Sequence, residues 1–321
     1  MTLTLQFFGG FVLLLFGAEY LVRGAVSIAR KLNVSAMIIG MTIVAWGTTA
    51  PELTVSLQAA MNDAPGIAIG NVVGSNIANM LLVLGASAVL FPIVVKPRDL
   101  YRDAAVMMGS ALLFTALALS GVIERWQGVL MIAALIVFSL YAFAAERRRG
   151  KSEGPGELAE EFQEVPQHFW LAVLSVLGGL IAIIYGANLL VSGATTAARL
   201  FGVGEEVIGL TVVAVGTSLP ELATAVVAAF RRNSDVALGN VIGANIYNLL
   251  AIIGLVSAVT PVPIPPQILT FDLWFMIGVT ALLLTLVFVQ NGLRRWAGAL
   301  FLCLFVAYTA LQYYGVENFL S

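Results

Sequence analysis

Long apolar stretches recur along almost the whole chain, and they constrain its fold more than any other feature. Of the 321 residues, 60% are hydrophobic and 11% are charged, against about 45–50% and about 25% in an ordinary soluble domain. An α-helix needs roughly 20 consecutive apolar residues to cross a bilayer. In lipid the backbone satisfies its hydrogen bonds only as a helix or a closed barrel. We therefore expect an all-α polytopic membrane protein.

The apolar stretches predict ten transmembrane helices. They lie near residues 3–29, 34–61, 66–95, 104–121, 126–145, 168–198, 206–230, 235–260, 270–290 and 296–314. One long polar stretch, residues 146–167, combines many charges with Pro and Gly, which is typical of a solvated linker. We accordingly divide the chain into a first five-helix half (1–145), a cytoplasmic linker (146–167) and a second five-helix half (168–321).

The basic residues indicate which way the chain is oriented. With ten crossings, thirteen Lys and Arg residues fall on one side of the membrane and two on the other, while Arg23 lies within the first span. Because Lys and Arg concentrate in cytoplasmic loops, this distribution predicts that both termini lie outside the cytoplasm. Nine or eleven spans would mix the counts. We expect a multi-pass protein of the cell inner or plasma membrane.

The two halves are related in sequence. A shift of 169 residues aligns Ile39–Asn79 with Ile208–Asn248 without a gap, and 20 of the 41 positions are identical. Since each half holds five spans, an odd number, the second half must enter the membrane from the opposite side. Inverted repeats of this kind place their shared site near the middle of the bilayer, at interrupted helices.

The repeat is most similar at two motifs that each place a carboxylate in mid-membrane. They are GTTAPE, which ends at Glu52, and GTSLPE, which ends at Glu221. A carboxylate at this depth costs roughly 2.5–3.5 kcal/mol even on the most lenient scale. The prolines before them lack an N–H and free a carbonyl one turn earlier. Thr48 and Thr217 lie one turn from these acids and face the same way.

These groups form a predicted all-oxygen cluster, which suits a hard cation such as Ca²⁺. The next span of each half adds GNVVGSNIAN (70–79) and GNVIGANIYN (239–248), with GxxxG spacing for close helix packing. Ser75, Asn79 and Asn248 could complete the coordination without adding charge.

The motifs resemble the α-repeats of the cation/Ca²⁺ exchanger superfamily, especially the prokaryotic Na⁺/Ca²⁺ exchangers, over nearly the whole chain. The resemblance implies that both glutamates bind Ca²⁺ and Na⁺ and that both threonines contribute hydroxyls. It also implies main-chain ligands at Ala45 and Ala214, a Na⁺ site at Ser75, and Asn79 and Asn248 at the centre. The mechanism it implies is alternating access, in which spans one and six slide across the other eight.

One departure from the family leaves the coupling ion open. Ala244 stands where relatives often have serine, so one side-chain oxygen is missing. Two carboxylates balance one Ca²⁺ or two protons, whereas three Na⁺ leave one positive charge. We expect a Ca²⁺ exporter driven by Na⁺, with an H⁺-coupled antiporter of Ca²⁺ or another divalent cation as the alternative and a passive cation channel as a weaker one.

Each of these residues could instead have a purely structural role. The acids could merely cross-link helices, the hydroxyls could bond their own backbone, and the asparagines could hold helices together. Glu19 and Arg23, one turn apart, are expected to form a structural ion pair. Nothing in the chain predicts an enzyme, a resident cofactor or a nucleic-acid partner; the expected partners are the transported ions and the lipid bilayer, and we expect a monomer.

Overall fold

The computed structural model describes residues 3–32, 34–62, 64–95, 97–153, 168–201 and 214–314. The first half contains α1 (Leu3–Leu32), α2 (Ala36–Ile39), η1 (Gly40–Val44), α3 (Ala45–Thr48), α4 (Ala50–Met61), α5 (Pro65–Ala78), η2 (Asn79–Val83), α6 (Leu84–Leu90), β1 (Ile93–Val94), α7 (Pro97–Ala118), β2 (Val122–Ile123) and α8 (Arg125–Glu153). The elements labelled η are single π-helical turns.

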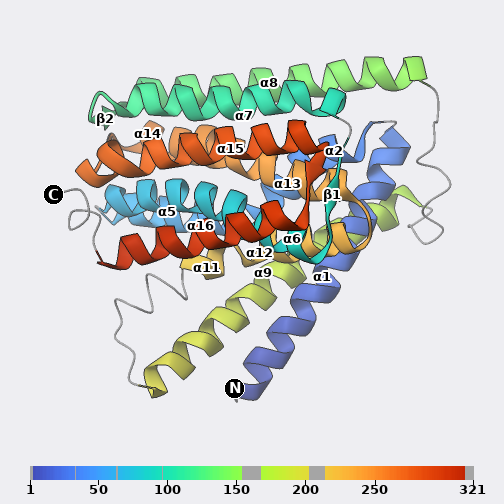
Figure 1. The fold of residues 1–321 in the computed structure, drawn as a ribbon, viewed down its shortest axis with the longest axis horizontal. Coiled ribbons are helices and arrows are strands. Elements are labelled where there is room, and N and C mark those ends of the chain that lie inside the picture. Colours follow the sequence, from blue (N-terminus) through green and yellow to red (C-terminus); the bar gives the residue numbers. More distant parts are fainter. Residues whose placement is uncertain are drawn as a thin grey trace.

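After its first helix, the described part of the second half follows the order seen from α3 onwards, with one additional π-turn. It contains α9 (Phe169–Leu200), α11 (Ala214–Thr217), α12 (Leu219–Phe230), α13 (Ser234–Tyr247), η4 (Asn248–Ile252), α14 (Ile253–Val259), β3 (Val262–Pro263), η5 (Ile268–Asp272), α15 (Leu273–Gln290), β4 (Gly292–Leu293) and α16 (Arg295–Tyr314). Most of these helices lie side by side in a stack, and α1 and α9 run obliquely to them (Figure 1).

The all-helical membrane fold is confirmed in its main features. Eight helices of the described part are long and apolar enough to cross a bilayer, and the helices on either side of Thr49 pass the same test only as a pair, which is bent by 44°. The helix from Leu219 to Phe230 is apolar but shorter, since it begins after the break at Ser218. Residues 206–213 of the expected seventh span lie outside the described part. The count of ten therefore stays a prediction.

One boundary differs from the sequence expectation. The fifth span was expected to end at residue 145, but α8 continues to Glu153. Most of the residues it adds are Glu, Arg and Lys, which are good helix formers, so the helix extends past its apolar part. Residues 154–167 of the expected linker lie outside the described part.

The equivalent helices α1 and α9 pack against each other in opposite directions. A Cβ placed on Gly10 would lie 2.8 Å from the carbonyl oxygen of Gly186, one on Gly17 would lie 2.9 Å from that of Gly179, and one on Gly24 would lie 2.7 Å from that of Ala172. Residue numbers therefore increase along α1 in the direction in which they decrease along α9. Glycine at the crossing lets the two backbones touch, and the antiparallel packing is what an inverted repeat requires.

Other contacts exchange between the halves in the same reciprocal way. Gly85 of α6 meets Gly298 of α16, and Gly254 of α14 meets Gly128 of α8. The short strands follow the same rule, because β1 pairs antiparallel with β4 and β2 pairs antiparallel with β3. The helix that ends the third span of each half, α6 or α14, therefore packs on the last helix of the other half, α16 or α8.

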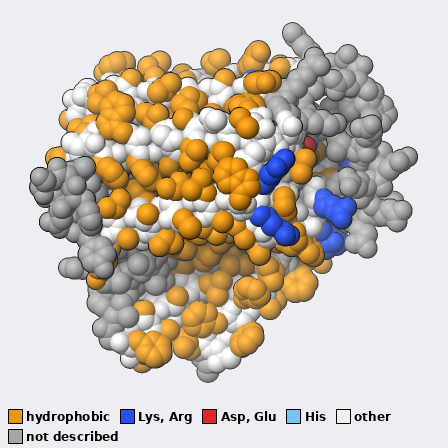
Figure 2. Space-filling view, viewed as in Figure 1, with side chains coloured by type: hydrophobic (Ala, Val, Ile, Leu, Met, Phe, Trp, Pro, Cys, Tyr) orange, Lys and Arg blue, Asp and Glu red, His pale blue; other side chains and the backbone are white. Residues whose placement is uncertain are grey.

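The surface is that of a chain surrounded by lipid. Figure 2 shows hydrophobic side chains over most of the visible face, with Lys and Arg gathered towards the end that holds β1 and α2 in Figure 1. Large apolar side chains such as Phe8 and Trp170 are more than two-thirds exposed. An exposed apolar surface of this extent needs a membrane to cover it.

Candidate cation site

The first motif breaks its helix at Thr49. Helix α3 ends at Thr48, α4 begins at Ala50, and Pro51 lies in the first turn of α4. Proline is well tolerated there because the first helical N–H groups have no partner within the helix. The break leaves Glu52 in the first turn of α4, where it is 1% exposed.

The second motif has the same local structure. Helix α11 ends at Thr217, α12 begins at Leu219, and Ser218 is the residue between them. Pro220 again lies in the first turn, followed by Glu221, which is completely buried. Both expected acids therefore lie at the N-terminus of a half-helix inside the protein. The positive end of a helix dipole stabilises negative charge at such a position.

The two motifs meet in the interior. The carboxylates of Glu52 and Glu221 are close enough to interact electrostatically, and the hydroxyls of Thr48 and Thr49 lie beside the Glu221 carboxyl group. No oxygen of either glutamate accepts a full hydrogen bond from a described residue. A buried polar atom without a partner costs about 1–3 kcal/mol, so this arrangement calls for a positive charge between the acids.

The other buried acids of the described part form a contrast. Asp103 is paired with Arg102, with 2.7 Å between Nε and Oδ1. Asp272 accepts hydrogen bonds from the Tyr308 hydroxyl at 2.9 Å and from Gln312 Nε2 at 2.6 Å. Protein groups pair with or donate hydrogen bonds to these two acids, whereas no described residue donates a full hydrogen bond to Glu52 or Glu221.

The expected asparagines each begin a π-helical turn. Asn79 is the first residue of η2, which packs against α12, and Asn248 is the first residue of η4, which packs against α4. Each is 1% exposed, and neither Oδ1 atom has a hydrogen-bond partner among the described residues. Single π-turns occur frequently at functional sites. The spacing of the motifs does not predict these π-turns.

Three further expected ligands, Thr48, Ala45 and Ser75, are also buried in the interior. The Thr48 hydroxyl lies 3.3 Å from the Ala45 carbonyl oxygen and 3.2 Å from Asn240 Oδ1. The Ala45 carbonyl also accepts the Thr49 N–H at 3.0 Å, so it serves the helix here. Ser75 is buried, 4% exposed, on α5. Ligation by these atoms stays a prediction.

The two copies differ in the exposure of one expected ligand. Thr48 is completely buried, whereas Thr217 is half-buried. Ala214 is the first residue of α11, and its side chain lies outside the described part. The expected GxxxG packing is confirmed at one copy, where a Cβ on Gly239 would lie 2.5 Å from the Met37 carbonyl oxygen. By the 169-residue shift, Gly70 and Gly74 correspond to Gly239 and Gly243, and the partners equivalent to Met37 and Met41 are residues 206 and 210, which lie outside the described part.

Two hydroxyls at the site were missed by the sequence reasoning. Thr49 and Ser218 occupy the breaks themselves, are 3% and 1% exposed, and have no hydrogen-bond partner among the described residues. The available signal was that both motif copies carry a hydroxyl at this position.

The buried atoms without partners together define what the site can hold. Among the described residues only the Thr115 hydroxyl is a buried side-chain oxygen that lacks a partner elsewhere. The others, which we call the oxygen cluster, belong to Thr49, Glu52, Asn79, Ser218, Glu221 and Asn248. In the described part no three His, Cys, Asp or Glu side chains gather. Oxygens with two carboxylates suit hard cations and not soft transition metals.

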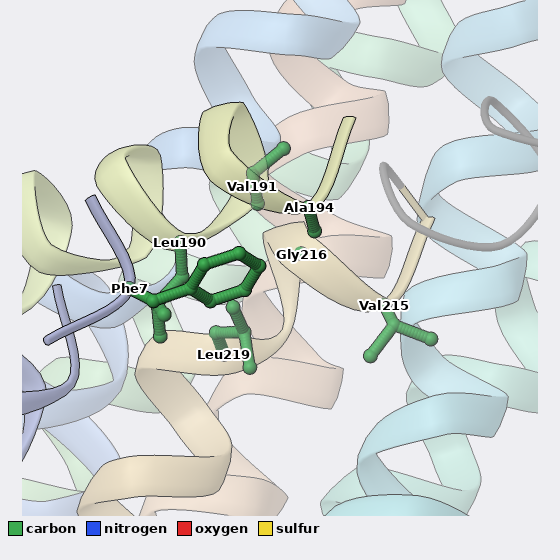
Figure 3. A pocket seen from close by; sticks show the side chains of 7 residues that line it. All are labelled: Phe7, Leu190, Val191, Ala194, Val215, Gly216 and Leu219. Atoms are coloured by element: carbon green, nitrogen blue, oxygen red, sulfur yellow. The ribbon is translucent and has the colours of Figure 1, made fainter. Parts of the chain in front are cut away.

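A small pocket lies beside the second motif and is separate in character. Its volume is about 220 Å³, and it is lined by Phe7, Leu190, Val191, Ala194, Val215, Gly216 and Leu219. The Phe7 ring lies among Leu190, Leu219 and Gly216 (Figure 3). The lining side chains are all apolar, so they offer no ligand for a cation, and none of these residues belongs to the oxygen cluster.

Comparison with known proteins identifies the family. The profile of the family described as "Sodium/calcium exchanger protein" matches residues 2–144 and again residues 171–314. The putative antiporter CaxA of Alkalimonas amylolytica is 38% identical over 95% of this chain and 96% of its own length. The sodium/calcium exchanger MaX1 of Methanosarcina acetivorans is 34% identical over 95% of this chain and 97% of its own.

A solved structure has the same fold. The sodium-calcium exchanger NCX_Mj, soaked with zero Na⁺ and Ca²⁺, superposes with a TM-score of 0.82 at 31% identity and covers 95% of this chain and 97% of its own. The resemblance inferred from the two motifs is thus confirmed for both halves and for the fold. This multi-span membrane protein belongs to the sodium/calcium exchanger protein family.

Proposed function

We propose that the protein is a secondary active antiporter that exports Ca²⁺ from the cytoplasm in exchange for Na⁺ by alternating access. The observation that carries the proposal is the oxygen cluster, in which two carboxylates from the two halves are buried together without hydrogen-bond partners. One Ca²⁺ balances their charge. The relatives support the choice of ions, since MaX1 and NCX_Mj are sodium/calcium exchangers by name.

The proposed ligands are the expected ones together with the two hydroxyls at the breaks. Glu52 and Glu221 supply the charge, and Asn79 and Asn248 supply neutral oxygens. Further hydroxyl and carbonyl oxygens come from Thr48, Thr49, Ser75, Thr217, Ser218, Ala45 and Ala214. The positive charge of the cation cancels the negative charge of the carboxylates in a low-dielectric interior. The protein with a bound ion therefore changes between its inward-open and outward-open states more easily than the empty protein. This requirement favours obligatory exchange over a passive channel.

Proton coupling is the second candidate, and Ala244 favours it. This residue is completely buried on α13, and its methyl group offers no oxygen. Two protons would neutralise the two acids as well as one Ca²⁺ does, whereas three Na⁺ would leave a net positive charge. The ion that drives export is thus the part of the proposal most in need of a direct measurement.

Flux into inverted vesicles tests the proposal. Purified protein is reconstituted, and Ca²⁺ uptake is followed under an imposed Na⁺ gradient and then under an H⁺ gradient. Uptake under the Na⁺ gradient alone is expected, and uptake only under the H⁺ gradient would establish the second candidate. If neither gradient moves Ca²⁺ while a downhill Ca²⁺ leak persists, the antiporter is excluded in favour of a channel.

The sidedness is proposed from charge. The Lys and Arg residues expected in the cytoplasm include Arg231 and Arg294, and the basic side chains visible in Figure 2 gather at one end. We place that end in the cytoplasm of a cell inner or plasma membrane, with both termini outside. A C-terminal reporter that works only in the cytoplasm should be inactive, and its activity would reverse the orientation.

A further inference from the structure

Two asparagines that supply no ligand to the oxygen cluster cross-link the halves of the protein. Asn76 lies on α5 and Asn245 at the same repeat position on α13, and they are 1% and 2% exposed. Asn76 Nδ2 lies 3.4 Å from the Asn245 carbonyl oxygen, and Asn245 Nδ2 lies 3.4 Å from the Asn76 carbonyl oxygen. The pair is reciprocal, as the repeat requires.

We call Asn76 and Asn245 the inner asparagines and Asn79 and Asn248 the outer ones. The side-chain oxygen of each inner asparagine accepts a hydrogen bond from an outer asparagine. Asn248 Nδ2 donates to Asn76 Oδ1 at 3.0 Å, and Asn79 Nδ2 donates to Asn245 Oδ1 at 3.2 Å. Each outer amide therefore has its nitrogen on an inner asparagine. Its oxygen, on the other branch of the amide, is buried and has no partner among the described residues.

Chemistry determines the orientation of all four amides. A carboxamide has a donor and an acceptor end, and which end lies where must be deduced from the network. A backbone carbonyl only accepts, so the inner amide must present its NH₂ to it, and its oxygen then faces the outer residue. The outer amide must therefore donate a hydrogen bond from its own NH₂ to that oxygen. Two backbone carbonyls thus force the oxygens of Asn79 and Asn248 away from the inner pair.

We propose that Asn76 and Asn245 are positioning residues that hold the carboxamides of Asn248 and Asn79 with their oxygens free to take the cation. The inference rests on the proposed function, and it assigns a crossed pattern, in which Asn76 acts through Asn248 and Asn245 acts through Asn79. Each inner residue bonds to the outer residue of the other half, so the network also couples the two copies of the site. Without an inner asparagine, the outer amide can turn its NH₂ towards the ion.

Double-mutant cycles with calorimetric Ca²⁺ titration of the full-length protein test the crossed pattern. Loss of a group that orients a metal ligand typically costs 10- to 100-fold in affinity, so Asn76→Ala and Asn245→Ala should each weaken Ca²⁺ binding by about that factor. In the Asn248→Ala background, Asn76→Ala should have no further effect, whereas Asn245→Ala should retain its effect. In the Asn79→Ala background the roles should be exchanged.

Controls separate positioning from mere packing. Thr280→Val removes a buried hydroxyl that bonds only its own helix and a methionine sulfur, and it should leave Ca²⁺ affinity unchanged. Thermal unfolding without Ca²⁺ reports whether each variant is folded, and Asn76→Leu is a second variant of similar volume that adds no charge and can neither donate to the carbonyl nor accept from Asn248.

The outcomes are distinguishable. Additive losses in every background, or affinities unchanged in variants that fold, would overturn the inference while leaving the proposed function intact. A wild-type protein that binds no Ca²⁺ would overturn the proposed function and the inference together.

Discussion

At the scale of single residues, the two glutamates differ from every other buried acid in the described part of the chain. Asp103 and Asp272 have hydrogen-bonding or charged partners, whereas the carboxylates of Glu52 and Glu221 have none. Burial without a partner is costly in a folded protein. Such a cost is tolerated where a ligand completes the site, so the missing partners are themselves a functional signal.

Replacing either glutamate by glutamine should separate binding from folding. Glu52→Gln and Glu221→Gln each remove one buried charge, and we expect Ca²⁺ affinity to fall by about 100-fold or more, because loss of one partner of a buried ionic contact costs about 3–5 kcal/mol. The ion-free protein should unfold at an equal or higher temperature, since a neutral side chain is less costly to bury. Calorimetric titration and thermal unfolding measure the two effects, and unchanged Ca²⁺ affinity in either variant would remove that residue from the site.

The residue at position 244 bears on Na⁺. Ala244 is completely buried on the face of α13 that corresponds to Ser75 in the first half. We expect Ala244→Ser to strengthen Na⁺ competition against Ca²⁺ by about 2- to 10-fold, the range of one additional hydrogen-bond-strength contact. Ca²⁺ titrations at several Na⁺ concentrations give the competition constant. A constant equal to that of the wild type would show that this position is not part of a Na⁺ site.

At the scale of elements, small residues allow backbones to touch wherever the halves meet. Membrane helices associate through close packing because lipid tails are as apolar as the side chains. The glycines of α1 and α9 stand seven residues apart and meet in antiparallel order. These two oblique helices thereby form one closely packed pair (Figure 1).

Two adjacent glycines of α9 offer a matched test of this packing. A Cβ on Gly179 would lie 2.7 Å from the Gly17 carbonyl oxygen, whereas one on Gly178 would meet no described atom within 4 Å. Gly179→Ala should destabilise the protein by about 1–3 kcal/mol through overpacking. Gly178→Ala should be neutral or stabilise the helix by up to about 1 kcal/mol. Thermal unfolding in one detergent compares them, and equal melting temperatures would refute the close crossing.

At the scale of the whole molecule, one ionic contact joins the oblique pair to a half-helix of the site. Glu19 of α1 pairs with Arg23, as expected from their spacing, and also with Arg231, which follows α12. Arg231 lies 2.9 Å from Glu19 through Nε and 2.6 Å through Nη2. If α1 slides past α12 during transport, this contact must break in part of the cycle.

Removing the contact should change the rate of exchange and not the affinity for ions. The Glu19 and Arg231 side chains are 19% and 41% exposed, and a pair this accessible contributes at most about 1 kcal/mol. Arg231→Gln should therefore change the exchange rate by up to about fivefold, and in the Glu19→Gln background, where the contact is already lost, it should have no further effect. Arg232→Gln is the neighbouring control. Additive effects, or an equal effect of the control, would show that the pair does not restrain the movement.

Much of this protein follows from its sequence alone. Apolar length predicts the membrane helices, and the 169-residue shift predicts which positions correspond. The position of Glu52 and Glu221 after a proline predicts buried acids at broken helices. These inferences succeed because each depends on local chain chemistry or on a pattern that repeats within the chain.

Other features were decided only by the tertiary structure. These are the hydrogen bond that Asn248 donates to Asn76, the contact of Arg231 with Glu19, and the unpartnered hydroxyls of Thr49 and Ser218. Each depends on how the two halves pack together. In a membrane helix apolar residues cover every face, so hydrophobic periodicity does not report which face meets another helix. The sequence could therefore predict the two buried acids, whereas only the packing of one half on the other determined which buried oxygens have no hydrogen-bond partner among the described residues.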